Sequence, residues 1–187
     1  EWEEDLSDRL SVKPVLDLLH TLRTATYIHR DAATVGDFEH YLEKWANEYT
    51  DYKILYLAMH GKTGEVALGE DSLTLVQLGD LLTGACSGRV IYFGSCSTMK
   101  QAPGALQSFA RKTGARAIIG YRRDVPWLET AAFEVLLLDR LSRSVRSDAL
   151  FRRLMKENEH LARTLGLVVA TRSAVHMAPL RKSRTGS

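Results

Sequence analysis

Two kinds of hydrophobic pattern alternate along the chain, one typical of buried strands and one typical of amphipathic helices. Short runs rich in Ile, Val, Tyr and Phe occupy residues 53–61, 89–98, 116–121 and 166–170. Because each run is nearly continuous and bounded by turn residues, it indicates a strand that is buried on both faces of a sheet. A further short strand is predicted over Thr26–Arg30.

Apolar residues at helical spacing fill the segments between these runs. They predict helices over residues 12–24, 34–49, 75–82, 105–112, 128–141 and 147–164. Two of these helices begin with a capping sequence, Thr34 followed by Asp37 and Thr74 followed by Gln77. Residues 61–74 predict a small hairpin that turns at residues 69–71. Strands that alternate with helices predict an α/β fold, a three-layer sandwich with a mostly parallel central sheet between two helix layers.

The length of 187 residues suits one domain with a sizeable core. We expect this single domain to span residues 1–170, and residues 171–187 to form a disordered basic tail. No apolar run approaches the ~18 residues that a membrane helix needs, and no signal peptide opens the sequence. The two cysteines, Cys86 and Cys96, form no disulfide framework, which fits a reducing compartment. We therefore expect a cytoplasmic protein without membrane association.

Charge is distributed unevenly along the chain. Residues 1–100 carry 9 Lys and Arg against 16 Asp and Glu, whereas residues 101–187 carry 16 against 7. The basic half has the charge to contact nucleic acid or an acidic partner. No aromatic residues interleave its arginines as single-strand binding requires, so a solvated basic surface is favoured over nucleic-acid binding. No Cys or His residues have the spacing of a metal cluster, and we predict neither a metal nor a cofactor.

Two of the predicted strands end at residues with catalytic chemistry, His60 in the first and Cys96 in the second. Adjacent parallel strands place their carboxyl ends at the same edge of the sheet, which is where open α/β sheets bind ligands. A cysteine nucleophile needs a base within hydrogen-bond reach, and a histidine supplies one. The sequence therefore predicts a hydrolytic dyad of Cys96 and His60.

Small residues surround both positions. Gly61 follows His60 and would let a substrate backbone approach closely, and a tight turn at Cys96 would leave amide groups free. We expect the Gly61 and Cys96 amides to donate hydrogen bonds to a developing oxyanion. A lone Cys is most often a small buried hydrophobe and a lone His an ordinary polar residue, so the prediction depends on their occurrence at consecutive strand ends. Cys86 has no such partner, and we predict a structural role for it.

The order of these motifs resembles the caspase-like clan of cysteine peptidases, clan CD, and most of all its bacterial CHAT-type domains. The likeness includes His60-Gly61, the strand that ends at Ser95-Cys96, the block Gly114–Gly120, and the loop of Asp124 to Trp127 that enters an apolar helix. It covers about residues 26–141. The Gln-Ala-Cys signature of true caspases is absent, so a preference for aspartate before the scissile bond does not carry over. The family sheet also has a strand before the first helix, and the acidic residues 1–10 do not have a strand pattern.

What the resemblance implies is an endopeptidase that cleaves protein or peptide substrates and is regulated by a partner protein or a fused module. It assigns His60 as base and Cys96 as nucleophile. It also implies that the loop after the third core strand helps to form the substrate groove, so the candidate substrate-binding residues are Ser95, Tyr121, Arg122, Arg123, Asp124 and Trp127. The two arginines favour an acidic substrate side chain, whereas several carboxylates favour a basic one: Glu70, Asp71, Asp80, Asp124 and Glu129.

Two other functions compete with the peptidase hypothesis. The first is a signalling or interaction module that keeps the caspase-like scaffold without turnover. The second is a nucleotide-binding domain, which ranks last because no Gly-x-Gly-x-x-Gly turn opens a helix after any predicted strand. The first alternative predicts that the side chains of His60 and Cys96 point apart.

Overall fold

A five-stranded sheet forms the centre of the computed structural model, which describes residues 11–143 and 147–180. Its strand order is β1-β5-β6-β7-β8, and the strands span Ile54–Leu57, Val90–Phe93, Ala117–Tyr121, Leu167–Ala170 and Val175–Met177. β1, β5 and β6 are parallel, β7 runs antiparallel to β6, and β8 runs antiparallel to β7. Four strands therefore point one way, which confirms the predicted mostly parallel sheet.

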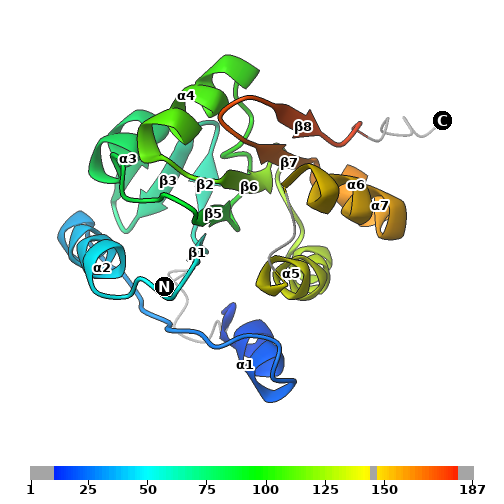
Figure 1. The fold of residues 1–187 in the computed structure, drawn as a ribbon, viewed down its shortest axis with the longest axis horizontal. Helices are drawn as coiled ribbons and strands as arrows, with labels where there is room; N and C mark the ends of the chain where they lie inside the picture. Colours follow the sequence, from blue (N-terminus) through cyan, green and yellow to red (C-terminus); the bar gives the residue numbers. More distant parts are fainter. Residues whose placement is uncertain (1–10, 144–146, 181–187) are drawn as a thin grey trace.

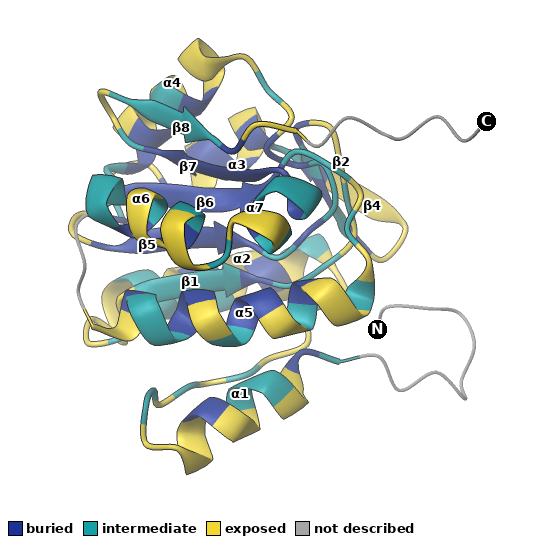
Figure 2. Cartoon of the chain, turned by 90° about the vertical axis from the view of Figure 1, so that its right-hand side faces the viewer, coloured by how far each residue is buried: buried dark blue, intermediate teal, exposed yellow. Residues whose placement is uncertain are grey.

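Helices cover both faces of this sheet (Figures 1 and 2). One face carries α2 (Val35–Asn47), α3 (Leu75–Leu81) and α4 (Pro103–Thr113), and the other carries α1 (Lys13–Thr21), α5 (Trp127–Ser142), α6 (Ser147–Glu157) and α7 (Glu159–Leu165). β5 illustrates how one strand serves both layers. Its Ile91 and Phe93 pack into the first cluster and its Val90 and Tyr92 into the second, because alternate side chains point to opposite faces. The predicted three-layer α/β sandwich is confirmed.

A second, small sheet lies between β1 and α3 in the chain. It consists of β2 (Gly61–Lys62), β3 (Glu65–Leu68) and β4 (Asp71–Thr74), all antiparallel. The predicted hairpin is confirmed, since Leu68 pairs with Asp71 across a turn in which Gly69 has a φ of 60°. Both predicted caps are also present, because Thr34 accepts a hydrogen bond from the Asp37 amide and Thr74 forms a capping box with Gln77.

Three of the predicted elements differ from the structure. Residues 26–30 form no strand, and the basic helix predicted over 147–164 is interrupted at Asn158, which separates α6 from α7. The segment predicted as a disordered tail contains β8, which completes the edge of the sheet beside β7. Residues 181–187, like the segment 1–10 that precedes the first helix, lie outside the described residues.

The missing strand at residues 26–30 has a simple physical reason, because a strand needs a hydrogen-bonded neighbour. This segment lies across a groove of about 1100 Å³ from β1, the edge strand, and does not pair with it. It is held instead by α1, since the amide of Ala25 donates to the Leu19 carbonyl and the Tyr27 hydroxyl donates to Asp17. The groove continues along β1 as far as His60.

Many basic side chains of the second half of the chain are paired within or between helices. Arg153 and Arg163 each bind a glutamate on their own helix, Glu157 and Glu159 respectively, and Arg140 reaches Glu157 from α5. The first two are pairs within one helix and the third joins two helices, and ion pairs as exposed as these contribute little to stability. None of the described helices is long and apolar enough to cross a lipid bilayer.

Candidate active site

The strands β1 and β5 bring His60 and Cys96 to the same edge of the sheet. The two strands are parallel and in register, with Ile54 beside Val90 and Leu57 beside Phe93. Both strands are shorter than the sequence predicts, so His60 and Cys96 lie in the loops that follow them. The Gly94 amide donates to the Leu57 carbonyl at 2.9 Å, which holds the start of the two loops together.

Close packing of Gly61 brings the His60 loop against the turn that contains Cys96. A Cβ atom on Gly61 would lie 2.4 Å from the Thr98 hydroxyl oxygen, 2.7 Å from the Cys96 carbonyl oxygen and 2.8 Å from the Ser95 Cβ. Only glycine fits there, and its backbone therefore touches the backbone of the cysteine turn. His60 itself is exposed, and its carbonyl accepts a hydrogen bond from the Ala67 amide of β3 at 2.9 Å.

Hydrogen bonds fix the Cys96 turn to the small sheet. The Thr98 hydroxyl donates to the Glu65 carbonyl at 3.0 Å, and the Gly64 amide donates to the Thr98 carbonyl at 3.2 Å. The side chains of Ser95 and Thr98 are buried and hydrogen-bonded to each other at 2.8 Å. These contacts anchor one side of the turn to the strands that follow His60.

The loop after β6 holds the other side of the turn. The Ser97 amide donates to the Arg123 carbonyl at 2.9 Å, and the Met99 amide donates to the Tyr121 carbonyl at 3.0 Å. The half-buried Cys96 sulfur accepts a hydrogen bond from the Val125 amide at 3.5 Å. Cys96 therefore lies between two loops that both leave the carboxyl ends of parallel strands.

Two of the six predicted substrate-binding side chains are buried, and a third contacts the segment around β8. Ser95 and Tyr121 are 1% and 0% exposed, so neither side chain lines a solvent-facing groove. The guanidinium group of Arg122 binds the Ala178 carbonyl and lies 3.8 Å from the Met177 sulfur, which ties the loop to the segment around β8. The side chains of these three residues therefore contact other parts of the chain, and their role in substrate binding stays a prediction.

The other three lie closer to the surface of the loop that follows β6. Asp124 is exposed, Arg123 is half-exposed, and Trp127 is half-buried at the first turn of α5. All three therefore remain candidates for contact with a substrate. The neighbouring Leu128 is 77% exposed, so this loop also presents an apolar side chain to solvent.

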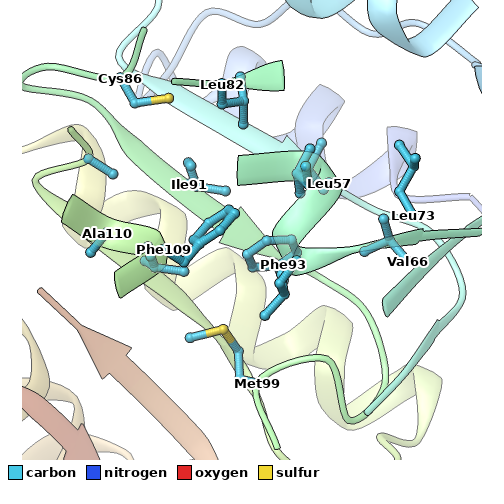
Figure 3. Close-up of a cluster of buried hydrophobic side chains, with 14 of the residues drawn as sticks. Leu57, Val66, Leu73, Leu82, Cys86, Ile91, Phe93, Met99, Phe109 and Ala110 are labelled. Atoms are coloured by element: carbon cyan, nitrogen blue, oxygen red, sulfur yellow. The ribbon is translucent and has the colours of Figure 1, made fainter. Parts of the chain in front are cut away.

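Cys86 is fully buried, whereas Cys96 is half-buried. Figure 3 shows it among buried side chains that include Leu82 and Ile91, and it has no exposed surface. Burial disfavours the thiolate and raises the pKa of the Cys86 thiol to about 11. The structural role predicted for Cys86 agrees with this environment.

A buried carboxylate close to the site is the feature that sequence reasoning missed. Glu134 of α5 is 3% exposed and accepts a hydrogen bond from the Tyr92 hydroxyl at 3.0 Å. Tyr92 also lies 2.6 Å, oxygen to oxygen, from Tyr121, and its ring stacks on that of Tyr56. A Cβ on Gly94 would lie 3.1 Å from the Glu134 carboxylate. The sequence did carry a signal for this carboxylate, because Glu134 lies among the apolar positions of the helix predicted over residues 128–141.

Burial raises the pKa of Glu134 to about 7, although the hydrogen bond from the Tyr92 hydroxyl opposes the shift. Between the usual glutamate pKa of 4.5 and about 7, the folded chain holds a proton that the unfolded chain has lost. Stability should therefore fall by roughly 3 kcal/mol as pH rises through this range. Urea unfolding at several pH values should show this fall in the wild type. Glu134→Gln should flatten it, and an equal slope in both proteins would contradict the assignment.

The described residues contain no group of three or more His, Cys, Asp or Glu side chains that could hold a metal ion. The groups at this edge of the sheet include the Cys96 thiol, the His60 imidazole, the Asp124 carboxylate and backbone amides. All of these groups come from the two loops after β1 and β5 and from the loop after β6.

Comparison with known proteins gives structural likenesses at low sequence identity and a sequence family. A secreted C11 cysteine protease from Bacteroides thetaiotaomicron, solved with an irreversible peptide inhibitor, is 15% identical with a TM-score of 0.48. The alignment covers 80% of this chain and 48% of that one, so the chain spans about half the length of that protease. No curated protein matches the sequence. Residues 1–169 match the model of a family of unknown function, DUF6642, and the chain belongs to that family.

Proposed function

We propose that this chain is a caspase-like cysteine endopeptidase in which Cys96 is the nucleophile and His60 the general base. The observation that carries the proposal is the contact of Gly61 with the Cys96 turn, which brings the His60 loop against the nucleophile. The order of motifs, His-Gly after one strand and Ser-Cys after its parallel neighbour, supports the same reading.

The proposed reaction proceeds through an acyl-enzyme. The Cys96 thiolate attacks the peptide carbonyl carbon, and the amides of Gly61 and Cys96 stabilise the oxyanion that forms. Collapse of this intermediate breaks the C–N bond as protonated His60 donates its proton to the leaving amine. His60 then accepts a proton from water, which attacks the thioester and releases the acid and the free thiol.

In this proposal the candidate substrate contacts are Arg123, Asp124, Trp127 and Leu128, which flank Val125, the residue whose amide binds the Cys96 sulfur. The charges of Arg123 and Asp124 oppose each other, so they select neither an acidic nor a basic substrate. A regulatory partner or fused module is part of the proposal, in keeping with the resemblance of the sequence to caspase-like proteins.

Selective alkylation tests the proposal directly. Iodoacetamide or an acyloxymethylketone probe should label Cys96 at neutral pH at least ~100-fold faster than Cys86, whose pKa of about 11 leaves little thiolate. Peptide mass spectrometry identifies the labelled residue. Labelling by the ketone probe should disappear in His60→Ala, because the probe needs an activated thiol. Preferential labelling of Cys86, or no labelling of Cys96, would instead favour a scaffold that acts only as an interaction module.

A further inference from the structure

Two hydrogen bonds link the Cys96 turn to the loop after β6 through neighbouring residues. The Ser97 hydroxyl donates to the Asp124 carboxylate at 2.8 Å, and the Val125 amide donates to the Cys96 sulfur at 3.5 Å. Because Cys96 adjoins Ser97 and Asp124 adjoins Val125, the two bonds close a small ring. The cysteine sulfur is one member of this ring, and the Asp124 carboxylate is another.

The backbone at Ser97 has a conformation that needs contacts from the loop after β6 to hold it. Ser97 has a φ of 52°, a left-handed backbone conformation that residues other than glycine rarely adopt. Such a conformation costs about 1–3 kcal/mol and persists where neighbouring contacts hold it. Two hydrogen bonds supply those contacts. The Ser97 amide donates to the Arg123 carbonyl, and the Ser97 hydroxyl donates to the Asp124 carboxylate.

The amide of Val125 is the group that gives this ring a chemical consequence. An N–H donor directed at sulfur favours the thiolate over the thiol, and the thiolate is the nucleophile. The hydrogen bond from the Val125 amide to the sulfur is 3.5 Å long, so a small shift of the loop after β6 would weaken or break it. The Asp124 side chain fixes that position, since it binds the residue directly after Cys96 and precedes the donor in sequence.

We propose that Asp124 is a positioning residue, which acts through Ser97 and holds the Val125 amide against the Cys96 sulfur. The inference deepens the proposed peptidase function and depends on it for its biological meaning. It also changes the role of Asp124, which the sequence presented as a substrate contact. The carboxylate acts on the nucleophile through the loop, whatever side chain the substrate carries.

The negative charge of Asp124 works against this role, and that opposition makes the proposal testable. A carboxylate near a thiol disfavours the thiolate by charge alone. The other charged or titratable residues of these loops and of the small sheet beside them are His60, Lys62, Glu65, Lys100, Arg122 and Arg123. If charge were the only influence, removing it with Ala or with Asn would speed the reaction of Cys96 equally. If position matters, Ala should slow the reaction, whereas Asn, whose amide oxygen still accepts from Ser97, should not.

The experiment measures the rate of iodoacetamide alkylation of Cys96 between pH 5 and 10 in the 187-residue chain. We expect Asp124→Ala and Ser97→Ala each to slow alkylation at pH 7 about tenfold, because either change releases the loop that holds the Val125 amide against the sulfur. Asp124→Asn should react at least as fast as wild type. The double variant Ser97→Ala/Asp124→Ala should be no slower than either single variant, because all three lose the same hydrogen bond between Ser97 and Asp124.

Asp51→Ala is the matched control, since Asp51 is an exposed carboxylate before β1, at the opposite edge of the sheet. Its pH profile should match wild type. Equal acceleration by Ala and Asn at position 124 would overturn the proposal in favour of a charge effect. Unchanged profiles in all variants would overturn it outright. Alkylation needs no peptide substrate, so a wild-type chain that hydrolyses no peptide would contradict the peptidase function and leave this result intact.

Discussion

Cys96→Ala should abolish peptide hydrolysis, and His60→Ala should slow it by at least about a thousandfold. Both effects follow from the acyl-enzyme route, because no thioester forms without the sulfur, and without His60 no base takes the thiol proton and no acid protonates the leaving amine. The effects of substituting residues that act as a unit are strongly non-additive. The double variant His60→Ala/Cys96→Ala should therefore be no slower than Cys96→Ala alone. Comparison of newly formed protein N-termini after treatment of a proteome with wild type and with Cys96→Ala measures this loss. It also reports the cleaved sequence.

Cys86→Ala supplies the control for this prediction. The side chain is buried in the cluster around Ile91 and Phe93, so its truncation should cost stability, about 1 kcal/mol, without changing the rate of hydrolysis of the folded chain. Wild-type cleavage by Cys96→Ala would contradict the proposed nucleophile. Equal loss in Cys86→Ala and Cys96→Ala would show that hydrolysis depends on packing and not on one thiol.

The edge of the sheet that carries the site was predictable because it follows from local patterns. Apolar runs such as Val90–Phe93 are buried on both faces only in a sheet covered by two helix layers. Parallel neighbours then place the residues after them at one edge. That reasoning predicted that His60 and Cys96 follow neighbouring parallel strands, and β1 and β5 are parallel neighbours in the structure.

Features that depend on long-range contacts were not predictable in the same way. Thr26–Arg30 has a strand composition, but no strand of the described chain pairs with it. Tyr121 and Ser95 have polar groups that suggest substrate contact, yet both are buried and hydrogen-bonded to neighbours from other segments. The bond between Val125 and Cys96 joins residues 29 positions apart and leaves no mark in either local sequence.

Gly61→Ala should reduce hydrolysis by at least about a hundredfold, although the change adds a single methyl group. That methyl would lie 2.7 Å from the Cys96 carbonyl oxygen, which belongs to backbone and cannot move aside as a flexible side chain would. The His60 loop and the Cys96 turn must therefore separate. A displacement of about 1 Å at a catalytic site can cost a factor of 10². A fluorogenic peptide assay, together with the rate of probe labelling at Cys96, measures the effect.

Gly104→Ala is the matched control for this change, because a Cβ on Gly104 meets no atom within 4 Å and the residue lies in the first turn of α4. It should leave hydrolysis unchanged, and thermal unfolding should show that both variants fold. The comparison separates two explanations for the glycine after His60. If the residue only opens space for a substrate, Gly61→Ala should weaken substrate binding but leave iodoacetamide alkylation of Cys96 at its wild-type rate. If the residue sets the contact between the two loops, as its neighbours in the structure indicate, alkylation and hydrolysis should fall together.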